Sequence, residues 1–365
     1  MEAELRASED GAETAEVVRP GLWSLRVPIP DNPLGYTLVY LFETKRGPVL
    51  VDTGWDHRDS WDALLAGIGC TGHRVEDVYG VLSTHHHNDH HGLAGRVRDV
   101  SGGWVAMHEA DARVVEHRGM TDEEWYRQTL ALMVEAGAPD EDLAGLPKPA
   151  EVRRHSAARP DRFLDDGEYA DVPGWTLQAV WTPGHTPGHL CFAERTHQLL
   201  LSGDHLLPDL TPHIGLPGGP VVGDPLADYL ASLHRLASLT FREVLPAHQH
   251  RFADAAARAR ALVDHHERRL ASVLAIVAAA SRLTAWEVAE HMEWSRPWGA
   301  FSVRTRCTAL TEARAHLRYL EVRGLLLHDV RGRLSTWAAT AAGHSMTQQS
   351  RLSSQYTSAE PGVSG

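Results

Sequence analysis

Apolar and polar residues alternate in two different rhythms over the first two thirds of the chain. Short runs rich in β-branched and aromatic residues, bounded by glycine or proline, predict strands at residues 22–27, 36–42, 48–51, 78–83, 104–107, 175–181, 190–194, 198–202 and 243–245. Segments with the apolar period of an amphipathic helix predict helices at residues 59–68, 93–97, 109–118, 122–136 and 224–239. Groups of strands followed by helices therefore occur twice, which indicates an α+β architecture made of two halves.

The pattern changes after Phe252, where predicted strands become rare. Residues 253–280 are rich in Ala, Leu and Arg, and they predict one long helix. Thr284 is a suitable N-cap for a second helix, because Glu287 three residues later completes a capping box. A third helix and a β-hairpin with a tight turn follow at residues 310–323, 325–330 and 334–337.

Both ends of the chain are polar. Residues 1–18 are acidic and predict a disordered tail, while residues 341–365 are rich in Ser and Gln and predict a flexible one. Between the tails we expect a larger domain over 19–262, and a linker helix with a small second domain over 263–340. An insertion at residues 119–149, made of a helix and a proline-rich loop, either packs against the core or forms a wall over the functional site.

Composition narrows the classes of protein. Hydrophobic residues make up 43% of the chain and charged residues 23%, as in ordinary globular proteins. No apolar run reaches the roughly 18 residues of a spanning helix, and the N-terminus lacks an apolar signal region. We therefore expect a cytoplasmic protein without a membrane partner, and three scattered cysteines argue against a disulfide framework. A net charge of −13, with only Lys45 and Lys148 as lysines, disfavours a nucleic-acid partner.

The densest chemical signal is a histidine-rich loop directly after the fourth predicted strand. His85 and His87 are two residues apart, so an extended backbone would send both imidazoles to the same side. Asp89 and His90 follow where a helix is expected to begin, and Gly92 leaves room at the crowded turn. One short loop can therefore serve two metal ions, with the first two histidines on one ion and the aspartate and third histidine on the other.

Three more candidate ligands lie far downstream. His185, Asp204 and His248 each occupy a turn near Gly or Pro after an apolar run. The chain has 24 histidines, so isolated pairs arise by chance, but seven ligand-type residues in this order do not. We interpret them as a site for two Zn²⁺ ions, with Fe or Mn as alternatives. Among the other histidines, His189 is a candidate for orienting a ligand, and His250 is the rival of His248.

Five elements of the sequence resemble, in order, the signature of the metallo-β-lactamase fold superfamily of metallohydrolases. They are Val51-Asp52-Thr53-Gly54, the motif from His85 to His90, His185, Asp204 and His248. The resemblance implies an αββα sandwich, with Asp52 as a structural residue beside the ligands. It also implies a set of ligands for each ion: His85, His87 and His185 for the first, Asp89, His90 and His248 for the second, and Asp204 as the bridge. The best-known β-lactamases of this superfamily carry Cys where Asp204 stands, so the resemblance does not favour antibiotic hydrolysis.

The helices and hairpin after residue 281 resemble a winged-helix domain. Some proteins of the superfamily carry such a domain, including a mitochondrial endoribonuclease. Residues 281–340 hold nine Arg and six acidic residues, which is only mildly basic. We therefore favour a structural role or homodimer formation for this domain over contact with nucleic acid.

The expected chemistry is metal-assisted hydrolysis. Two neighbouring metal ions can share a hydroxide, lower its pKa towards ~7 and polarise a carbonyl oxygen. Asp204 would hold the ions together and Asp89 would accept a hydrogen bond from the hydroxide, so both are candidate catalytic residues. By its similarity to glyoxalase II-type and acyl-thioesterase members, the chain is predicted to hydrolyse a small acyl substrate, an ester, thioester or lactone. The alternatives are a single-strand endoribonuclease and a non-catalytic regulatory protein with a vestigial site.

Overall fold

The computed structural model describes residues 14–117, 122–148, 158–218 and 223–357. The chain forms two compact units, each built from more than one stretch of sequence. The first unit draws on Met1–Met120, Arg153–Pro212 and Asp228–Arg260, and the second on Thr121–Val152, His213–Ala227 and Ala261–Gly365.

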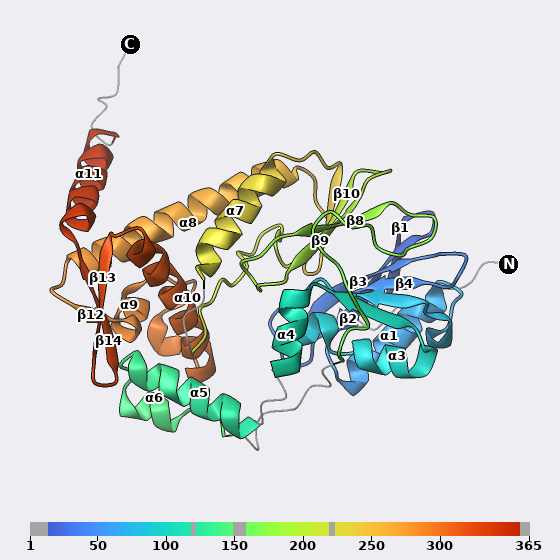
Figure 1. The fold of residues 1–365 in the computed structure, drawn as a ribbon, viewed down its shortest axis with the longest axis horizontal. Coiled ribbons are helices and arrows are strands. Elements are labelled where there is room, and N and C mark those ends of the chain that lie inside the picture. The colour runs from blue at the N-terminus through green and yellow to red at the C-terminus, as the bar shows by residue number, and fades with distance from the viewer. Residues whose placement is uncertain (1–13, 118–121, 149–157, 219–222, 358–365) are drawn as a thin grey trace, which may run out of the picture. The chain divides into compact units, whose positions relative to one another are not determined.

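Two β-sheets form the middle of the first unit (Figure 1). The larger sheet has seven strands, in the order β1 (Ala15–Arg19), β2 (Leu22–Pro28), β3 (Tyr36–Phe42), β4 (Val49–Val51), β5 (Gly80–Leu82), β6 (Trp104–Met107) and β7 (Arg162–Phe163). It is antiparallel from β1 to β4 and parallel from β4 to β7. The smaller sheet has four strands, in the order β11 (Glu243–Pro246), β10 (Leu199–Gly203), β9 (Leu190–Glu194) and β8 (Leu177–Trp181).

Strand β3 contributes residues to two apolar clusters, one on each face of the larger sheet. Tyr40 and Phe42 pack in a cluster that also contains Leu177 and Phe192 of the smaller sheet. The alternate residues of β3, including Leu41, face a second cluster, because successive side chains of a strand point to opposite faces. The two sheets therefore lie face to face, with the larger one covered on its outer face by helices.

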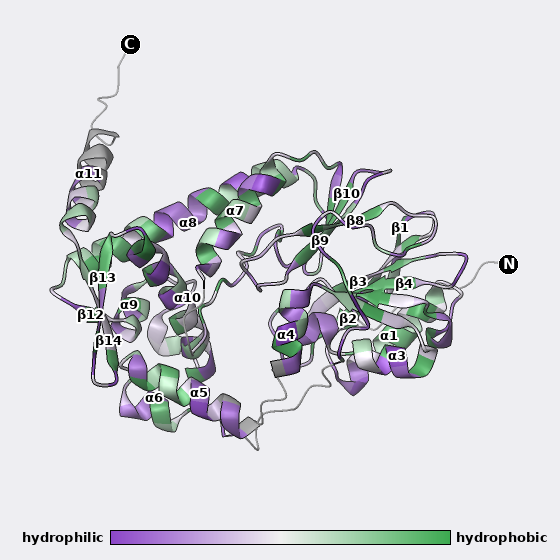
Figure 2. Ribbon diagram, viewed as in Figure 1, coloured by the Kyte–Doolittle hydropathy of each residue, from purple (hydrophilic) through white to green (hydrophobic). Residues whose placement is uncertain are grey.

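Helices complete the first unit on the outside. Helix α1 (Arg58–Cys70) and helix α3 (Ala94–Ser101) contribute Leu64 and Val97 to the outer cluster of the larger sheet. The short helices η1 (Val75–Asp77), α2 (Asn88–His91) and α4 (Glu109–His117) lie in its connections. Helix α7 (Pro225–Ala237) buries an apolar face, and its Tyr229 hydroxyl donates to the carbonyl of His205 at 3.0 Å. Figure 2 shows hydrophobic and hydrophilic residues alternating along α7, as expected of a helix with one covered face.

The second unit combines helices with a small antiparallel sheet. Its strands lie in the order β12 (Leu283–Thr284), β14 (Leu334–Ala339) and β13 (Leu326–Arg331). Its helices are α5 (Asp122–Glu135), α6 (Asp140–Ala144), most of α8 (Ala255–Ala278), α9 (Ala285–His291), η3 (Trp298–Ala300), α10 (Val303–Val322) and α11 (Ala341–Thr357). The capping box predicted for α9 is confirmed, because Glu287 N–H donates to Thr284 Oγ1 and Thr284 N–H donates to Glu287 Oε2. The winged-helix assignment stays an interpretation of this arrangement.

Several expected boundaries differ from the structure. Residues 15–18, placed in a disordered tail, belong to the edge strand β1 (Ala15–Arg19), whose backbone pairs with β2; residues 1–13 lie outside the described residues. The tail expected from residue 341 begins as helix α11. Helix α10 starts at Val303 instead of residue 310, because Ser302 accepts a hydrogen bond from Thr305 N–H and caps it.

The continuous domain division at residue 262 is also not what the structure shows. Helices α5 and α6 of the insertion belong to the second unit, together with residues 213–227. The backbone N–H of Trp286 donates to Ala136 O at 3.1 Å, and the guanidinium of Arg306 lies 2.7 Å from Asp142. These contacts join segments more than 140 residues apart, so no local periodicity could reveal them.

Among the described residues, no helix is both long and apolar enough to cross a membrane.

Glu312 on α10 carries a pH-dependent contribution to the stability of the second unit. Its carboxylate lies 2.8 Å from Arg269 Nη2 and 3.7 Å from His213 Nδ1. Burial alone would raise the pKa of Glu312, but the neighbouring His213 and Arg269 outweigh it and lower the pKa from 4.5 to about 2. The ionised form is therefore the one that the folded state favours.

We expect Glu312→Gln to destabilise the protein by about 1–3 kcal/mol at pH 7, because Arg269 loses its buried partner. A lowered pKa stabilises the fold fully above the unfolded value near 4.5 and progressively less as the pH falls towards 2. The difference in the free energy of unfolding between the variant and the unmodified protein should therefore be smaller at pH 3 than at pH 7. Urea unfolding at both pH values measures it, with Glu290→Gln on the exposed side of α9 as control; a difference independent of pH would contradict this reasoning.

Candidate metal centre

The seven predicted ligands lie together in the first unit, on loops at the carboxyl ends of strands. Four of them follow β5, one lies in the turn from β8 to β9, one directly follows β10 and one follows β11: His85, His87, Asp89, His90, His185, Asp204 and His248. Asp89 and His90 lie in α2, which begins where the sequence predicted a helix. The rigid sheets thus bring together residues more than 160 positions apart.

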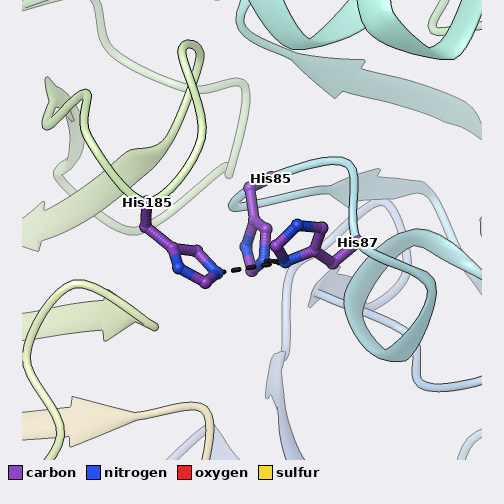
Figure 3. Close-up of side chains that lie close together, drawn as sticks. All are labelled: His85, His87 and His185. Atoms are coloured by element: carbon purple, nitrogen blue, oxygen red, sulfur yellow. Dashed lines mark hydrogen bonds between the residues drawn. The ribbon is translucent and has the colours of Figure 1, made fainter. Parts of the chain in front are cut away.

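Three imidazoles form the first group (Figure 3). His85 Nε2 lies 2.9 Å from His87 Nδ1, and His185 Nε2 lies 3.0 Å from the same nitrogen. Their rings point to a common centre from two different loops. A tetrahedral zinc ion with bonds of about 2.0–2.1 Å would separate its ligand atoms by about 3.3 Å, so these three nitrogens are close to the spacing that one ion requires.

The second group combines a carboxylate with two imidazoles. Asp89 Oδ2 lies 3.6 Å from His90 Nε2 and 3.4 Å from His248 Nε2. All three ligand atoms fall within 4.8 Å of one another. The structure therefore brings together the residues of each set that the family resemblance implied, and their role as metal ligands stays a prediction.

Asp204 lies between the groups and presents one oxygen to each. Its Oδ2 is 3.4 Å from His185 Nε2 of the first group. Its Oδ1 is 3.5 Å from His90 Nε2 and 3.2 Å from His248 Nε2 of the second. A carboxylate in this position can hold two ions a fixed distance apart.

Buried polar atoms without a hydrogen-bond partner indicate that the second group suits a cation. His90 Nε2, His248 Nε2 and Asp204 Oδ1 are such atoms among the described residues. Leaving a buried polar atom unpaired costs about 1–3 kcal/mol, so three of them around one point are explained if a metal ion binds there. Burial opposes the charge on His248, but the Asp204 carboxylate raises its pKa to about 10, as a field that attracts cations should.

Hydrogen bonds from the surrounding residues set the orientation of two ligands. His90 Nδ1 lies 2.8 Å from Asp52 Oδ2, and His248 Nδ1 lies 2.9 Å from the carbonyl oxygen of Tyr36. Both partners only accept, so each Nδ1 carries a proton, and each Nε2 is the nitrogen that a metal ion would bind in place of a proton. Asp52 also accepts from Thr84 N–H at 2.8 Å, and it adopts the left-handed conformation with φ 62°, which costs a non-glycine residue energy.

We expect Asp52→Asn to weaken metal binding by about 10- to 100-fold. Asn tolerates the left-handed backbone, and its carbonyl oxygen can still accept from Thr84 N–H. Its NH2 group would then face the Nδ1–H of His90, and two donors cannot form a hydrogen bond. Competition with a chromophoric chelator measures the dissociation constants, and Asp62→Asn on the exposed surface of α1 is the control. Unchanged metal affinity in Asp52→Asn would show that this hydrogen bond does not orient His90.

His189 acts on the bridging residue. The backbone N–H of Asp204 donates to His189 Nε2 at 3.2 Å, and His189 Nδ1 lies 2.9 Å from Thr182 Oγ1. Burial lowers the pKa of His189 to about 3, so it stays neutral and can accept. His250, considered as a rival of His248, is instead an exposed residue 3.9 Å from Asp209.

The turn after the motif needs a glycine, as expected. A side chain at Gly92 would place its Cβ 2.2 Å from Asn88 O and 2.7 Å from Asp56 N. One buried carboxylate next to the site was not predicted. Asp111 of α4 contacts both histidine-bearing loops, and neither a motif nor a spacing in the sequence distinguishes it from the other aspartates.

Comparison with known proteins places this geometry in context. Residues 32–248 match the family model described as Metallo-beta-lactamase superfamily. The lactamase-like protein vrtG of Penicillium aethiopicum is 28% identical over 247 residues, which are 68% of this chain and 62% of that protein. The beta-lactamase-like protein 2 homolog of Caenorhabditis elegans is 23% identical over 79% of this chain and 81% of its own length. The chain thus spans less than two thirds of the fungal relative.

Solved structures extend the similarity beyond the matched domain. A metallo-beta-lactamase family protein from Thermus thermophilus is 32% identical with a TM-score of 0.74, covering 89% of this chain and 100% of that one. A beta-lactamase domain protein from Burkholderia ambifaria has a TM-score of 0.75 at 24% identity, covering 93% and 97%. At that identity the second likeness concerns the fold alone.

Proposed function

Since this chain belongs to the metallo-β-lactamase superfamily, we propose that it is a dinuclear metal-dependent hydrolase of a small ester, thioester or lactone. The observation that carries the proposal is Asp204, whose two oxygens lie 3.2–3.5 Å from imidazole nitrogens of two separate groups. A site for a single ion would not need a carboxylate shared in this way.

The side chains of the site would have two roles, which are to bind the metal ions and to balance their charge. When bound, two zinc ions would supply Lewis acidity and a nucleophile derived from water. Asp204 is buried between the ligand groups and neutralises part of their charge. Asp89, beside His90 and His248, is placed to bind an ion and to accept a proton or hydrogen bond from the nucleophile. Zinc is proposed because the ligands are imidazoles and carboxylates, which also suit iron or manganese.

A nuclease is the less favoured alternative. The chain has a net charge of −13, and affinity for nucleic acid depends on cations that neutralise phosphates. If the second unit is a winged helix, α10 is the helix expected to enter a groove. Its residues 313–317 are all buried, and Arg314 Nη1 donates to the carbonyl of Pro217 at 2.8 Å. Because this part of α10 is covered, a structural or dimerisation role is favoured for the second unit. The cytoplasmic location of the protein stays a prediction.

The name of one relative supports the reaction class. A protein of Bacillus subtilis named probable metallo-hydrolase YqjP is 27% identical over 62% of this chain and 70% of its own length. The presence of Asp204 instead of Cys argues against antibiotic hydrolysis as the main activity. The proposal therefore concerns simpler acyl substrates.

Metal analysis followed by a substrate panel tests the proposal. We expect elemental analysis to find about two metal ions per chain after zinc reconstitution, and hydrolysis of at least one thioester, ester or lactone that chelation removes and zinc restores. Metal-dependent cleavage of single-stranded RNA without acyl hydrolysis would favour the nuclease instead. Absence of bound metal after reconstitution would contradict both functions.

A further inference from the structure

Asp111 is a buried carboxylate between the two loops that carry the first group of histidines. Its side chain has no exposed surface. Its Oδ2 accepts from the backbone N–H of His86 at 2.8 Å and from the hydroxyl of Thr186 at 2.8 Å, and its Oδ1 accepts from the backbone N–H of Gly188 at 2.6 Å. The carboxylate thus accepts the hydrogen bonds of buried donors on both loops, which water would accept if they were exposed.

The donors are next to the predicted ligands. His86 lies between His85 and His87 in the sequence, and Thr186 directly follows His185. Each histidine-bearing loop is therefore bonded to Asp111 within one residue of a ligand. A shift of a metal ligand by about 1 Å can abolish the function of a site. The distance between these two loops should therefore affect metal binding.

The close approach of the second loop depends on glycine. A Cβ at Gly188 would lie 2.4 Å from Asp111 N and 2.8 Å from its Oδ1. The chain therefore uses a residue without a side chain where the loop meets the carboxylate. This contact is tight, so the loop has little freedom to move away from α4.

The carboxylate is held in its charged form. Burial alone would raise the pKa of Asp111, but His86, whose Nδ1 lies 3.0 Å from Oδ2, and the hydrogen bonds to Asp111 lower it to about 2. A charged acceptor makes hydrogen bonds that are roughly twice as strong as those of a neutral one. Asp111 can therefore hold both loops over the whole ordinary pH range.

We propose that Asp111 is a positioning residue that sets the separation of the loops bearing His85, His87 and His185, and so determines affinity for the first metal ion. The proposal rests on the dinuclear site proposed above. Asp52 orients His90 of the second group, so each metal site has its own supporting carboxylate. Disturbing Asp111 should therefore affect the two ions unequally.

The test is a zinc titration of Asp111→Asn by chelator competition. An asparagine in either orientation turns its amide towards a backbone N–H, so at least one loop loses its acceptor. We expect one of the two zinc dissociation constants to rise about 10- to 100-fold while the other stays within about threefold. X-ray absorption at one zinc per chain should then report two imidazoles, those of His90 and His248, since the site with three imidazoles is the weakened one.

Two variants of Thr186 keep the proposal testable if Asp111→Asn does not fold. Thr186→Val removes one hydrogen bond to Asp111 at nearly constant shape, and we expect a rise of about fivefold in the same dissociation constant. Thr186→Ser keeps the hydroxyl and should restore wild-type affinity. Asp161→Asn is the control, because Asp161 also joins distant segments, through Val105 N–H and Arg98, away from the ligands.

The outcomes separate this proposal from the proposed function. Wild-type protein that binds two zinc ions, with unchanged constants in Asp111→Asn, overturns the role of Asp111 and leaves the dinuclear site standing. An equal loss at both sites, or three imidazoles at one zinc per chain, also overturns it. Wild-type protein that binds no zinc overturns the proposed function and this inference with it.

Discussion

Asp204→Ala is expected to lower kcat by at least about 10³-fold, a loss of about 4 kcal/mol in transition-state stabilisation. The two oxygens of Asp204 face His185 on one side and His90 and His248 on the other. Removing them takes a ligand from both ions and the charge that holds the ions together. The protein should still fold, because Asp204 is not a member of either of the two large apolar clusters.

Kinetics and metal content together check this prediction. Asp204→Ala should keep its far-ultraviolet circular dichroism while losing at least one metal ion per chain. Asp209→Ala, on an exposed residue of the following loop, is the control and should keep full activity. A kcat within tenfold of the wild type in Asp204→Ala would show that the bridge is misassigned.

Deletion of residues 281–365 is expected to prevent recovery of soluble protein. This segment covers the helices of the insertion: Met133 Sδ lies 3.5 Å from Cys307 Sγ, and a Cβ at Gly137 would lie 3.0 Å from Thr284. Met133 and Leu146 are buried, and exposing each costs about 1.5–3 kcal/mol. That loss is a large share of the roughly 5–15 kcal/mol that keeps a protein folded, and it creates an apolar patch prone to aggregation.

Soluble yield and size-exclusion chromatography measure the effect of the truncation. We expect less than a tenth of the full-length yield, with the remainder in aggregates. A shorter deletion, of residues 341–365, is the matched control, because the described side chains of α11 are largely exposed. A monodisperse, metal-binding protein after the longer deletion would mean that the insertion does not need the C-terminal segment.

The amino-acid sequence alone was sufficient to predict which residues the structure brings together in the candidate metal centre. His85, His87, Asp89 and His90 are close in sequence, and local backbone geometry is enough to group them. The later ligands follow strands that their apolar runs predict, and similarity to known signatures supplied their order. Strands β2–β6 and β8–β11 and the capping box of Thr284 could likewise be predicted, because apolar periodicity and capping depend on neighbours within a few residues.

Only the tertiary structure revealed the role of Asp111 and the membership of α5 and α6 in the second unit. Asp111 is one of many aspartates in the sequence, and its significance comes from donors 25 and 77 residues away. Asp142 meets Arg306 at 164 residues' separation. Contacts of this kind depend on how whole helices and strands pack against one another. The packing energy comes from many residues that are far apart in the sequence, so no short segment contains the information. Local pattern therefore determines which elements form, whereas the three-dimensional arrangement decides which polar groups support the site.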